Sequence, residues 1–436
     1  MDERIAELET RLDHFDRAER DQALDELLRL ARGGRLRLPE PEPKVNLHAH
    51  SFYSYNAMGY SPTHIVWRAR REGLRAVGLV DFDVFDGIDE FFRAGELLGI
   101  PTVAGMETRA FIPEFSTREI NSPGEPGITY HMVTGVTRSA IDDPQAVEFA
   151  TMLRASARHR NESVVERVNA YLAPVALDYE ADVLPLSPSA TPTERHLCLA
   201  YETKAATVYP DRDARVRFWA QRLGTPQGEV SDLLDDSRRL QALIRSKTMK
   251  RGGVGYQEPT PESFPRMTDV NRFALAVGGI PTATWLDGTS PGENDIDELL
   301  DLHMQAGAAA LNIIPDRNWN IRDPAVKDLK VRNLYRIVAL AAARDLPLVI
   351  ERPGPQVRGR FRRPRTRPRR RRLPAGGRGP GRPHGGRARG RGRVSQRLGA
   401  RSLQDGGREE RLFRPPRPVV AAIARKPRRA AAYCPV

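Results

Sequence analysis

The stretch VNLHAHS, residues 45–51, joins the end of an apolar strand to two histidines. Successive side chains of a strand alternate between its faces, so His48 and His50, two residues apart, point the same way. Two imidazoles on one side of a strand end can hold a metal ion, which is one interpretation of the stretch. The other is a polar rim with two solvated histidines, because a His-x-His pattern alone is a weak signal.

Length and composition favour an intracellular protein. A chain of 436 residues is long enough for one large or two medium domains. Its two cysteines, Cys198 and Cys434, give no disulfide framework and suit a reducing compartment. The charged, helical N-terminus does not resemble a signal peptide, and no apolar run approaches the roughly 20 residues of a membrane span. We expect a cytoplasmic location without membrane contact; the oligomeric state stays open.

The net charge of +13 hides two oppositely charged parts. Residues 351–436 contain 27 Lys+Arg and 4 Asp+Glu, a net charge of +23. The remaining 1–350 therefore carry a net charge of −10. The high isoelectric point describes the basic tail and not the part of the chain that carries the candidate site.

The pattern of apolar residues divides the chain into five parts. Residues 1–35 show helical spacing of leucines ending at two glycines, which predicts an amphipathic helix. Residues 44–140 and 266–350 alternate strand and helix patterns, which predicts a parallel sheet or barrel in two pieces. Residues 141–265 are polar and mostly helical, so we interpret them as an insertion. Residues 351–436 have no hydrophobic period, and we expect this Arg/Pro/Gly-rich tail to be disordered.

Polar side chains recur where the predicted strands end. Asp81 ends one strand in GLVDFDVFDG, Glu107 ends the next in VAGMET, and His131 lies in TYHMVTG. The C-terminal ends of strands in a parallel barrel meet on one face, where active sites are built. Together with His48 and His50, these residues suit one or two divalent metal ions. Taken singly, each also fits a helix cap or a satisfied polar residue.

The blocks LHAHS, GLVDFDVFDGIDEF, IPTVAGMET and YHMVTGV together resemble the PHP family (polymerase and histidinol phosphatase) over roughly residues 45–350. The resemblance implies a distorted, seven-stranded β/α barrel of TIM-like type with divalent metal ions, Zn, Mn or Fe, as cofactors. It implies catalytic roles for Asp81 and Glu107. The metal ligands that it implies are His48, His50, Asp81, Glu107 and His131. The DFDV, GGVGY, TWLDG and NIIPDRNWN blocks also resemble a less characterised subgroup of this family.

The resemblance implies hydrolysis of a phosphoester, with a phosphorylated small molecule or nucleotide as substrate. Arg195 and His196, in TERHLCLA, match an Arg-His block that contacts substrate in PHP phosphoesterases. Surface charges at a helix start are the alternative interpretation of this pair. Arg317, in PDRNWN, is expected at the same barrel rim, where it binds substrate or only accompanies a helix cap.

Several positions depart from the family pattern. Phe82 stands where the family usually has a metal-binding histidine, and Thr284 and Trp285 stand where a later histidine would fall. The metal site is therefore expected to be atypical and depleted, with Asp287 or Asp316 as open candidates for further ligands. An alternative function is a catalytically decayed barrel that serves as a ligand-binding or regulatory module.

The glycine-rich stretch KTMKRGGVGYQEP, residues 247–259, allows two interpretations. Its backbone N–H groups can cradle a phosphate, with Lys247, Lys250 and Arg251 nearby. It can equally be a flexible return from the helical insertion. It is not a Walker A loop, because no Gly-Lys-Ser/Thr follows.

The tail that follows Ile350 also has two interpretations. Its dense arginines would bind nucleic acid non-specifically by neutralising phosphates. Alternatively, Arg, Pro, Gly and Ala dominate out-of-frame translation of GC-rich DNA, and back-translating residues 351–368 one base later permits an ordinary sequence containing Phe-Val-Asp-Asp-Phe. We therefore also consider a frameshift near Ile350, which would remove the residues that follow the last strand and leave this chain inactive.

Overall fold

The structure, a computed structural model, describes residues 2–56, 58–258 and 263–350, all within one compact unit. The tail of residues 351–436 lies outside the described residues, so nucleic-acid binding and the frameshift both stay predictions. Among the described helices, none is both long and apolar enough to cross a membrane.

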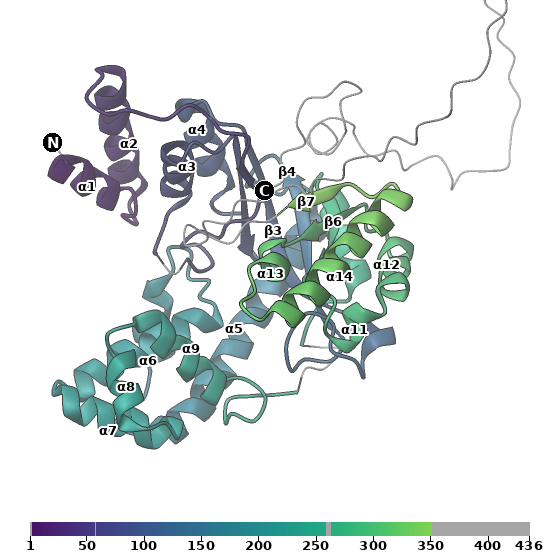
Figure 1. Cartoon of the computed structure of the whole chain (residues 1–436). Helices are drawn as coiled ribbons and strands as arrows, with labels where there is room; N and C mark the ends of the chain where they lie inside the picture. Colours follow the sequence, from purple (N-terminus) through teal and green to yellow (C-terminus); the bar gives the residue numbers. More distant parts are fainter. Residues whose placement is uncertain (1, 57, 259–262, 351–436) are drawn as a thin grey trace, which may run out of the picture. The chain divides into compact units, whose positions relative to one another are not determined.

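Seven strands form one sheet in the order of the sequence, and the sheet curls into a nearly closed barrel (Figure 1). The strands are β1 (Val45–Asn46), β2 (Ala76–Phe82), β3 (Thr102–Phe111), β4 (Ile128–Val136), β5 (Ile280–Trp285), β6 (Ala310–Ile313) and β7 (Leu348–Ile350). The backbone N–H of Leu47 donates to the carbonyl of Ile350 at 3.4 Å, which brings the first and last strands together. The predicted seven-stranded α/β barrel is confirmed.

The sheet is not parallel throughout, which corrects one expectation from the sequence. β4 runs antiparallel to both β3 and β5, while the other neighbouring strands are parallel. The connection between β3 and β4 contains only a short 3-10 turn, Pro113–Phe115, and no crossover helix. Parallel neighbours are usually joined through an α-helix, and without one the chain turns back so that β4 returns along β3.

Helices cover the outer face of the barrel and bury its apolar side chains. The covering helices are α3 (Pro62–Arg71), α4 (Ile88–Leu98), α10 (Met267–Ala276), α11 (Pro291–Asn294), α12 (Ile296–Gln305), α13 (Asp316–Trp319) and α14 (Pro324–Ala343). Leu79 of β2 and Met106 of β3 pack with Phe91 of α4 in the largest core cluster. Since alternate strand residues face the helices, their neighbours in sequence face the barrel interior.

The predicted helical insertion forms helices with a core of their own. It comprises α5 (Pro144–Leu172), a π-helical turn (Tyr179–Val183), a 3-10 turn (Leu184–Leu186), α6 (Glu194–Val208), α7 (Arg212–Leu223), α8 (Gln227–Leu233) and α9 (Ser237–Thr248). α5 contributes Ala146 and Leu153 to the barrel core and Val168 and Leu172 to the core of the insertion. The same long helix therefore belongs to both.

The N-terminal segment forms two helices, whereas the sequence predicted one continuous helix. α1 (Asp2–Arg11) and α2 (Arg17–Arg32) are separated at His14 and Phe15. Asp16 starts the second helix, because its carboxylate accepts the backbone N–H of Ala18 at 2.9 Å. We call residues 2–32 the N-terminal hairpin.

Two glycines let neighbouring backbone segments approach near the candidate site. A Cβ at Gly78 would lie 2.2 Å from the carbonyl oxygen of Leu47, the residue just before His48. A Cβ at Gly105 would lie 2.1 Å from the carbonyl oxygen of Val133 on β4. Any other residue at either position would push apart strands that carry or flank the site.

Candidate metal centre

Three side chains from β3 and from the segment after β1 lie close enough to share one ion. The Nε2 atoms of His48 and His50 are 3.2 Å apart, and Oε2 of Glu107 lies 3.6 and 3.3 Å from them. Two ligands of a tetrahedral ion with bonds of about 2.05 Å are roughly 3.3 Å apart. The spacing therefore fits one divalent ion, and within the described ranges this is the one such group of three.

The group is enclosed but reaches solvent through one imidazole. His48 and Glu107 are buried, whereas the side chain of His50 keeps 24% of its surface exposed. Burial alone would raise the pKa of Glu107, but the hydrogen bonds and charges of His48 and His50 outweigh it and lower this pKa to about 2. Glu107 is therefore an ionised carboxylate, the form that binds a cation.

Backbone hydrogen bonds fix the segment that carries the two histidines. The side-chain oxygen of Asn46 accepts the N–H of His48 at 3.2 Å. Ala49 bonds across to β2 twice, donating to the carbonyl of Gly78 at 3.1 Å and accepting from Val80 at 2.9 Å. The segment thus continues the edge of the sheet beyond β1, with His48 and His50 on either side of this anchor.

Asp81 anchors this segment rather than joining the group of three, which differs from the prediction that it is a ligand. Its carboxylate accepts the N–H and the Oγ–H of Ser51, both at 2.6 Å, and the Oγ–H of Ser54 at 2.7 Å. Asp81 is buried, and burial raises its pKa despite these donors. With three donors occupying its oxygens, it fixes the residues that follow His50; its predicted catalytic role stays a prediction.

Phe82 covers one imidazole of the group. Its ring stacks on His50 with a centroid separation of 4.7 Å and an interplanar angle of 4°. Its backbone pairs in register with Glu107 on β3. The residue that departs from the family pattern therefore holds the ring plane of His50 by an apolar contact, in place of supplying a ligand.

His131 is not brought to the group, because it pairs in register with Thr108, the residue after Glu107, and so lies on the opposite face of the sheet. Its Nε2 lies 2.5 Å from Oδ1 of Asn271 on α10, and its ring stacks on His303 of α12 at 5.6 Å. Both partners are on the helix-covered face of the sheet. Burial lowers the pKa of His131 to about 4. His131 is therefore a neutral imidazole on the helix-covered face, and its predicted role as a metal ligand stays a prediction.

Charged side chains gather beside the group between the barrel and the insertion. We call Arg109, Arg160, Arg245 and Lys250, with the acids Glu125 and Glu194, the basic cluster. Arg109 donates to both oxygens of Glu125 at 3.0 and 2.9 Å, and Glu194 pairs with Lys250 at 3.2 Å and with Arg245. The charge of the buried Asp83 also acts on Arg160 and Arg109, so four basic groups lie near these three carboxylates.

Burial and neighbouring charges shift the pKa values of the basic cluster. Burial and the nearby charge of Arg109 lower the pKa of Arg160 to about 10. Burial lowers the pKa of Lys250, although Glu194 opposes this shift. The side chains of Arg109, Arg245 and Lys250 keep about a quarter of their surface exposed, at 23, 27 and 25%. A bound anion would relieve the crowding of positive charge.

Tyr130 connects the basic cluster to the group of three. Burial raises the pKa of its hydroxyl, the charges of Arg109 and Arg245 lower it, and the carboxylate of Glu107 raises it. Arg109 follows Glu107 by two residues on β3, so both side chains are on one face of the strand. The sequence analysis missed Arg109, although its two-residue spacing from Glu107 was a usable signal. It named Lys250 only as a residue near the glycine-rich stretch.

The predicted substrate contacts differ in where they lie. His196 is buried at the start of α6, where its Nδ1 accepts the N–H of Thr193 at 2.9 Å, and its ring meets Tyr55 edge-on at 5.0 Å. Burial lowers the pKa of His196 to about 4. Arg195 is half-buried, and its charge lowers the pKa of Tyr55, which burial raises. Arg317 is exposed on α13.

The two open candidates for further ligands stand apart from the group of three. Asp287 pairs with Lys330 of α14 at 2.7 Å, and this contact lowers its pKa against the effect of burial. Asp316 is the first residue of α13. Neither carboxylate is in the group that His48 and His50 form with Glu107.

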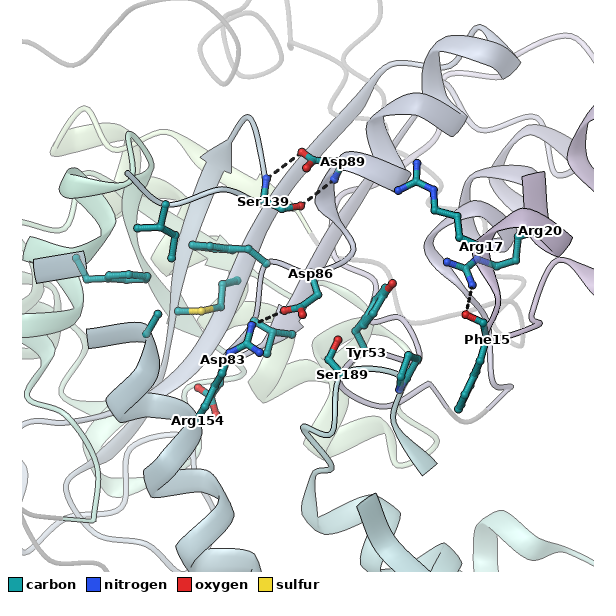
Figure 2. A pocket seen from close by; sticks show the side chains of 17 residues that line it. Phe15, Arg17, Arg20, Tyr53, Asp83, Asp86, Asp89, Ser139, Arg154 and Ser189 are labelled. Atoms are coloured by element: carbon teal, nitrogen blue, oxygen red, sulfur yellow. Dashed lines mark hydrogen bonds and ion pairs between the residues drawn. The ribbon is translucent and has the colours of Figure 1, made fainter. Parts of the chain in front are cut away.

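A cavity of about 490 Å³ lies beside the N-terminal hairpin, and Figure 2 shows Arg17 and Arg20 on its hairpin side. Arg154 reaches Asp86 across it at 2.5 Å. Its lining combines the hairpin, the β2–α4 and β4–α5 connections, α5 and the insertion: Phe15, Arg17, Arg20, Tyr53, Asp83, Val84, Phe85, Asp86, Asp89, Met106, Ser139, Ile141, Ala150, Arg154, Pro188, Ser189 and Phe273. None of the three residues of the metal group lines it.

Parts of the chain are similar to curated proteins, although no family model matches it. The error-prone DNA polymerase of Corynebacterium diphtheriae is 37% identical over 73 residues, 17% of this chain and 7% of the polymerase. That of Nocardia farcinica is 43% identical over 65 residues, 15% of this chain and 6% of the polymerase. A 5'-3' exoribonuclease of Haemophilus influenzae is 39% identical over 64 residues, 15% and 23% of the two chains. The matches thus span less than a quarter of each relative.

Two solved structures cover more of the chain at lower similarity. A Bifidobacterium adolescentis protein described as a metal-dependent phosphoesterase has 20% identity and a TM-score of 0.45 over 72% of this chain and 88% of that one. An amidohydrolase from Chromobacterium violaceum, with bound sulfate and no metal, has 16% identity and a TM-score of 0.47 over 71% and 88%. At these TM-scores neither likeness bears on the chemistry. The chain has a seven-stranded, nearly closed α/β barrel, its sequence blocks resemble the PHP family, and part of it is similar to error-prone DNA polymerases.

Proposed function

We propose that the chain is a metal-dependent phosphoester hydrolase of the PHP type with an atypical, depleted metal site. His48, His50 and Glu107 would hold one divalent cation, and the basic cluster would receive the phosphate. The observation that carries this proposal is a juxtaposition: Glu107 of the His-His-Glu group lies on the same strand face as Arg109, beside the basic cluster. Phosphoester hydrolysis needs both features, because the substrate and its transition state are anionic.

Each part of the site has a role that follows from its chemistry. Two imidazoles and one carboxylate are ligands that suit Zn, Mn or Fe. A divalent cation, when bound, acts as a Lewis acid toward the phosphoryl oxygens and lowers the pKa of water. Glu107 would supply the negative charge that retains the ion, and Phe82 would keep His50 in its ring plane. Arg109 and Lys250 would neutralise the phosphate at partly buried positions, where charge–charge interactions are strong.

The substrate class that we propose is a nucleotide or another phosphorylated small molecule. The printed names of the curated relatives, DNA polymerases and an exoribonuclease, support testing nucleotide phosphoesters first. Arg195 and His196 remain proposed substrate contacts, and both lie near Tyr55. Arg317 is a weaker candidate because it is exposed on α13.

The test measures metal and activity on the same samples. The full chain is stripped with EDTA, titrated with Mn²⁺ or Zn²⁺ by calorimetry, and assayed on p-nitrophenyl phosphoesters and on short oligonucleotides. We expect one tight ion per chain, and loss of both binding and hydrolysis in His48→Ala and Glu107→Gln. Asp328→Asn, at an exposed position of α14, is the matched control. A wild-type chain that binds no ion, or variants that retain full activity, would contradict the proposal.

A second candidate function is a ligand-binding or regulatory module with a decayed site. It is favoured by Phe82, which stacks on His50 where the family has a metal-binding histidine. This alternative predicts that the metal-loaded chain binds nucleotides without hydrolysing any of the phosphoesters tested. Equilibrium binding of a fluorescent nucleotide beside a negative activity screen would select it.

A further inference from the structure

We propose that the N-terminal hairpin is a clamp that sets the metal affinity of the site, with Arg20 as its positioning residue. The inference rests on the proposed function, because it concerns the ion that His48, His50 and Glu107 would hold. The hairpin supplies none of these residues. It acts through residues 51–56 and 58–61, which follow His50 and which we call the site loop.

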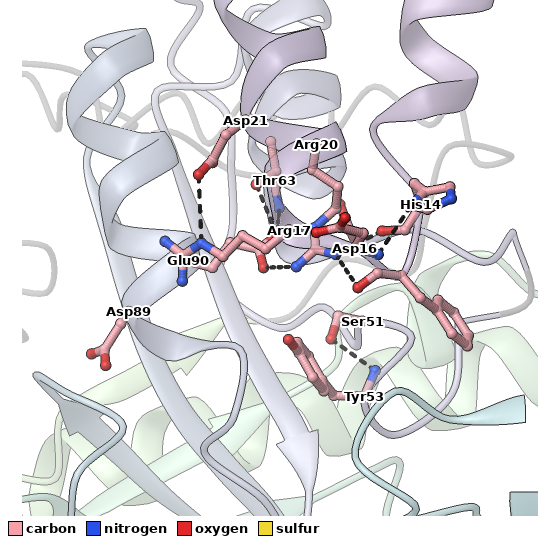
Figure 3. Close-up of polar contacts among 12 residues, drawn as sticks. His14, Asp16, Arg17, Arg20, Asp21, Ser51, Tyr53, Thr63, Asp89 and Glu90 are labelled. Carbon is pink, nitrogen blue, oxygen red and sulfur yellow. Dashed lines mark hydrogen bonds and ion pairs between the residues drawn. The ribbon is translucent and has the colours of Figure 1, made fainter. Parts of the chain in front are cut away.

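The hairpin is joined to the barrel by a buried ion pair. Arg20 of α2 is 1% exposed and donates from Nε to Glu90 of α4 at 3.0 Å, while its Nη2 bonds the second oxygen of Glu90 (Figure 3). Its remaining nitrogen donates to the carbonyls of His14 and Phe15 at 2.6 and 2.9 Å. Arg20 therefore fixes both the turn of the hairpin and the attachment of the hairpin to α4.

The same turn holds the site loop from outside the barrel. The guanidinium carbon of Arg20 lies 5.3 Å from the ring centroid of Phe52, and Phe15 meets this ring edge-on, also at 5.3 Å. At the far end of the loop, Ser61 donates to the carbonyl of Leu12 at 2.5 Å. Its backbone N–H donates to Asp13 at 2.8 Å. The hairpin thus contacts the loop near both of its ends.

The site loop transmits this constraint to His50. Phe52 is two residues after His50, and its N–H donates to the carbonyl of Tyr60 at 2.9 Å, which closes the loop. Asn56 donates from its side chain to the carbonyl of His50 at 2.7 Å. Asp81 holds Ser51 from the barrel side. His50 therefore lies between an anchor on β2 and a clamp from the hairpin.

The hairpin packs into the largest core cluster through Leu8, Leu24 and Leu27, and Phe15, Arg17 and Arg20 line the cavity of about 490 Å³ beside it. Phe15 itself is 49% exposed, and its described ring contact is the one with Phe52. Removing it should change the clamp while leaving the core intact.

The experiment measures Mn²⁺ affinity of the full chain by calorimetry for Arg20→Met, Arg20→Lys and Phe15→Ala, with thermal melts in EDTA. Arg336→Met, which breaks an exposed pair with Asp297 on the outer helices, is the control. Substitutions that disturb the support of metal ligands typically weaken affinity by about 10- to 100-fold. We expect a loss of about tenfold in Arg20→Met, a smaller loss in Arg20→Lys and Phe15→Ala, and no change in the control.

The outcomes separate the clamp from the proposed function. If the wild-type chain binds no Mn²⁺, the proposed function fails and the clamp fails with it. If the wild-type chain binds Mn²⁺ and the folded variants bind it equally well, the clamp alone is overturned. Should Arg20→Met not fold, Phe15→Ala decides, because its half-exposed ring can be removed at little cost to folding. A loss of affinity in Arg336→Met as large as in Arg20→Met would also overturn the clamp.

Discussion

Replacing Asp81 distinguishes an anchor from a metal ligand. In Asp81→Ala, three buried donors lose their acceptor: the N–H and Oγ–H of Ser51 and the Oγ–H of Ser54. Each buried donor left unpaired costs about 1–3 kcal/mol, and removing a buried charge offsets part of the sum. We expect the free energy of unfolding to fall by about 3–5 kcal/mol in EDTA.

The conservative variant Asp81→Asn should behave differently. Its remaining oxygen can still accept from the N–H of Ser51 and from Ser54, and its amide can donate to Oγ of Ser51, which must then act as an acceptor. We expect a loss of about 1–2 kcal/mol in stability and a loss of about tenfold in metal affinity, since the histidines and Glu107 are intact.

The assays are urea denaturation in EDTA and calorimetric titration with Zn²⁺, with Asp328→Asn as control. The reasoning is refuted if Asp81→Asn abolishes metal binding as completely as His48→Ala, since Asp81 would then be a ligand. It is refuted equally if Asp81→Ala unfolds at the urea concentration of the wild type. Either result would show that the hydrogen bonds to Ser51 and Ser54 are not the main role of this carboxylate.

Three further predictions follow from other parts of the molecule. Burial, with the neighbouring His131, lowers the pKa of His303 to about 3, so its contribution to stability is present above its unfolded pKa of 6.5 and is lost as the pH falls. Between pH 7.5 and 5, the free energy of unfolding, measured by urea denaturation, should therefore fall by about 2 kcal/mol less in His303→Leu than in the wild type. Lys250→Met should raise KM for a phosphoester about tenfold with little change in kcat, because one charge-assisted contact is lost. Lys247→Met, at an exposed position, should leave KM unchanged, and equal KM values in the two variants would contradict phosphate binding by the basic cluster. Oγ of Thr284 is buried without a hydrogen-bond partner among the described residues, so Thr284→Val should stabilise the chain by about 1 kcal/mol in thermal denaturation; a destabilised variant would indicate a bound water or ligand at that hydroxyl.

The strands of the barrel were predictable because the sequence of a buried strand is a short apolar run between turns. All seven runs, from VNL at residues 45–47 to LPLVI at residues 346–350, contain a strand in the structure. The direction of β4 was harder to predict, since direction leaves no mark on composition. The missing helix between Glu107 and His131 was the available signal, because the connection between parallel neighbours usually contains an α-helix.

The candidate site was predictable where spacing within one segment decided it. His48 and His50 lie together as expected, and Glu107 joins them from the neighbouring strand. Asp81 could not be assigned from sequence, because the serines that occupy its carboxylate, Ser51 and Ser54, have no pattern that separates an anchor from a ligand. The basic cluster needed the fold, since its four basic residues come from β3, α5, α9 and the segment just after α9, far apart in sequence.

Because β4 is reversed, the length of α5 determines where the insertion lies along the barrel. β4 ends at the rim opposite the one where β3 ends, so the chain must travel back along the barrel before the insertion can reach Glu107. The 29 residues of α5 span about 44 Å, more than the roughly 31 Å of the nine-residue β4. Adding one residue to its middle would turn the insertion by about 100°, whereas adding seven would lift it by about 10 Å with a rotation of only about 20°. Changes in the length of this helix therefore offer a way to raise the insertion away from the barrel stepwise and widen the space for larger molecules.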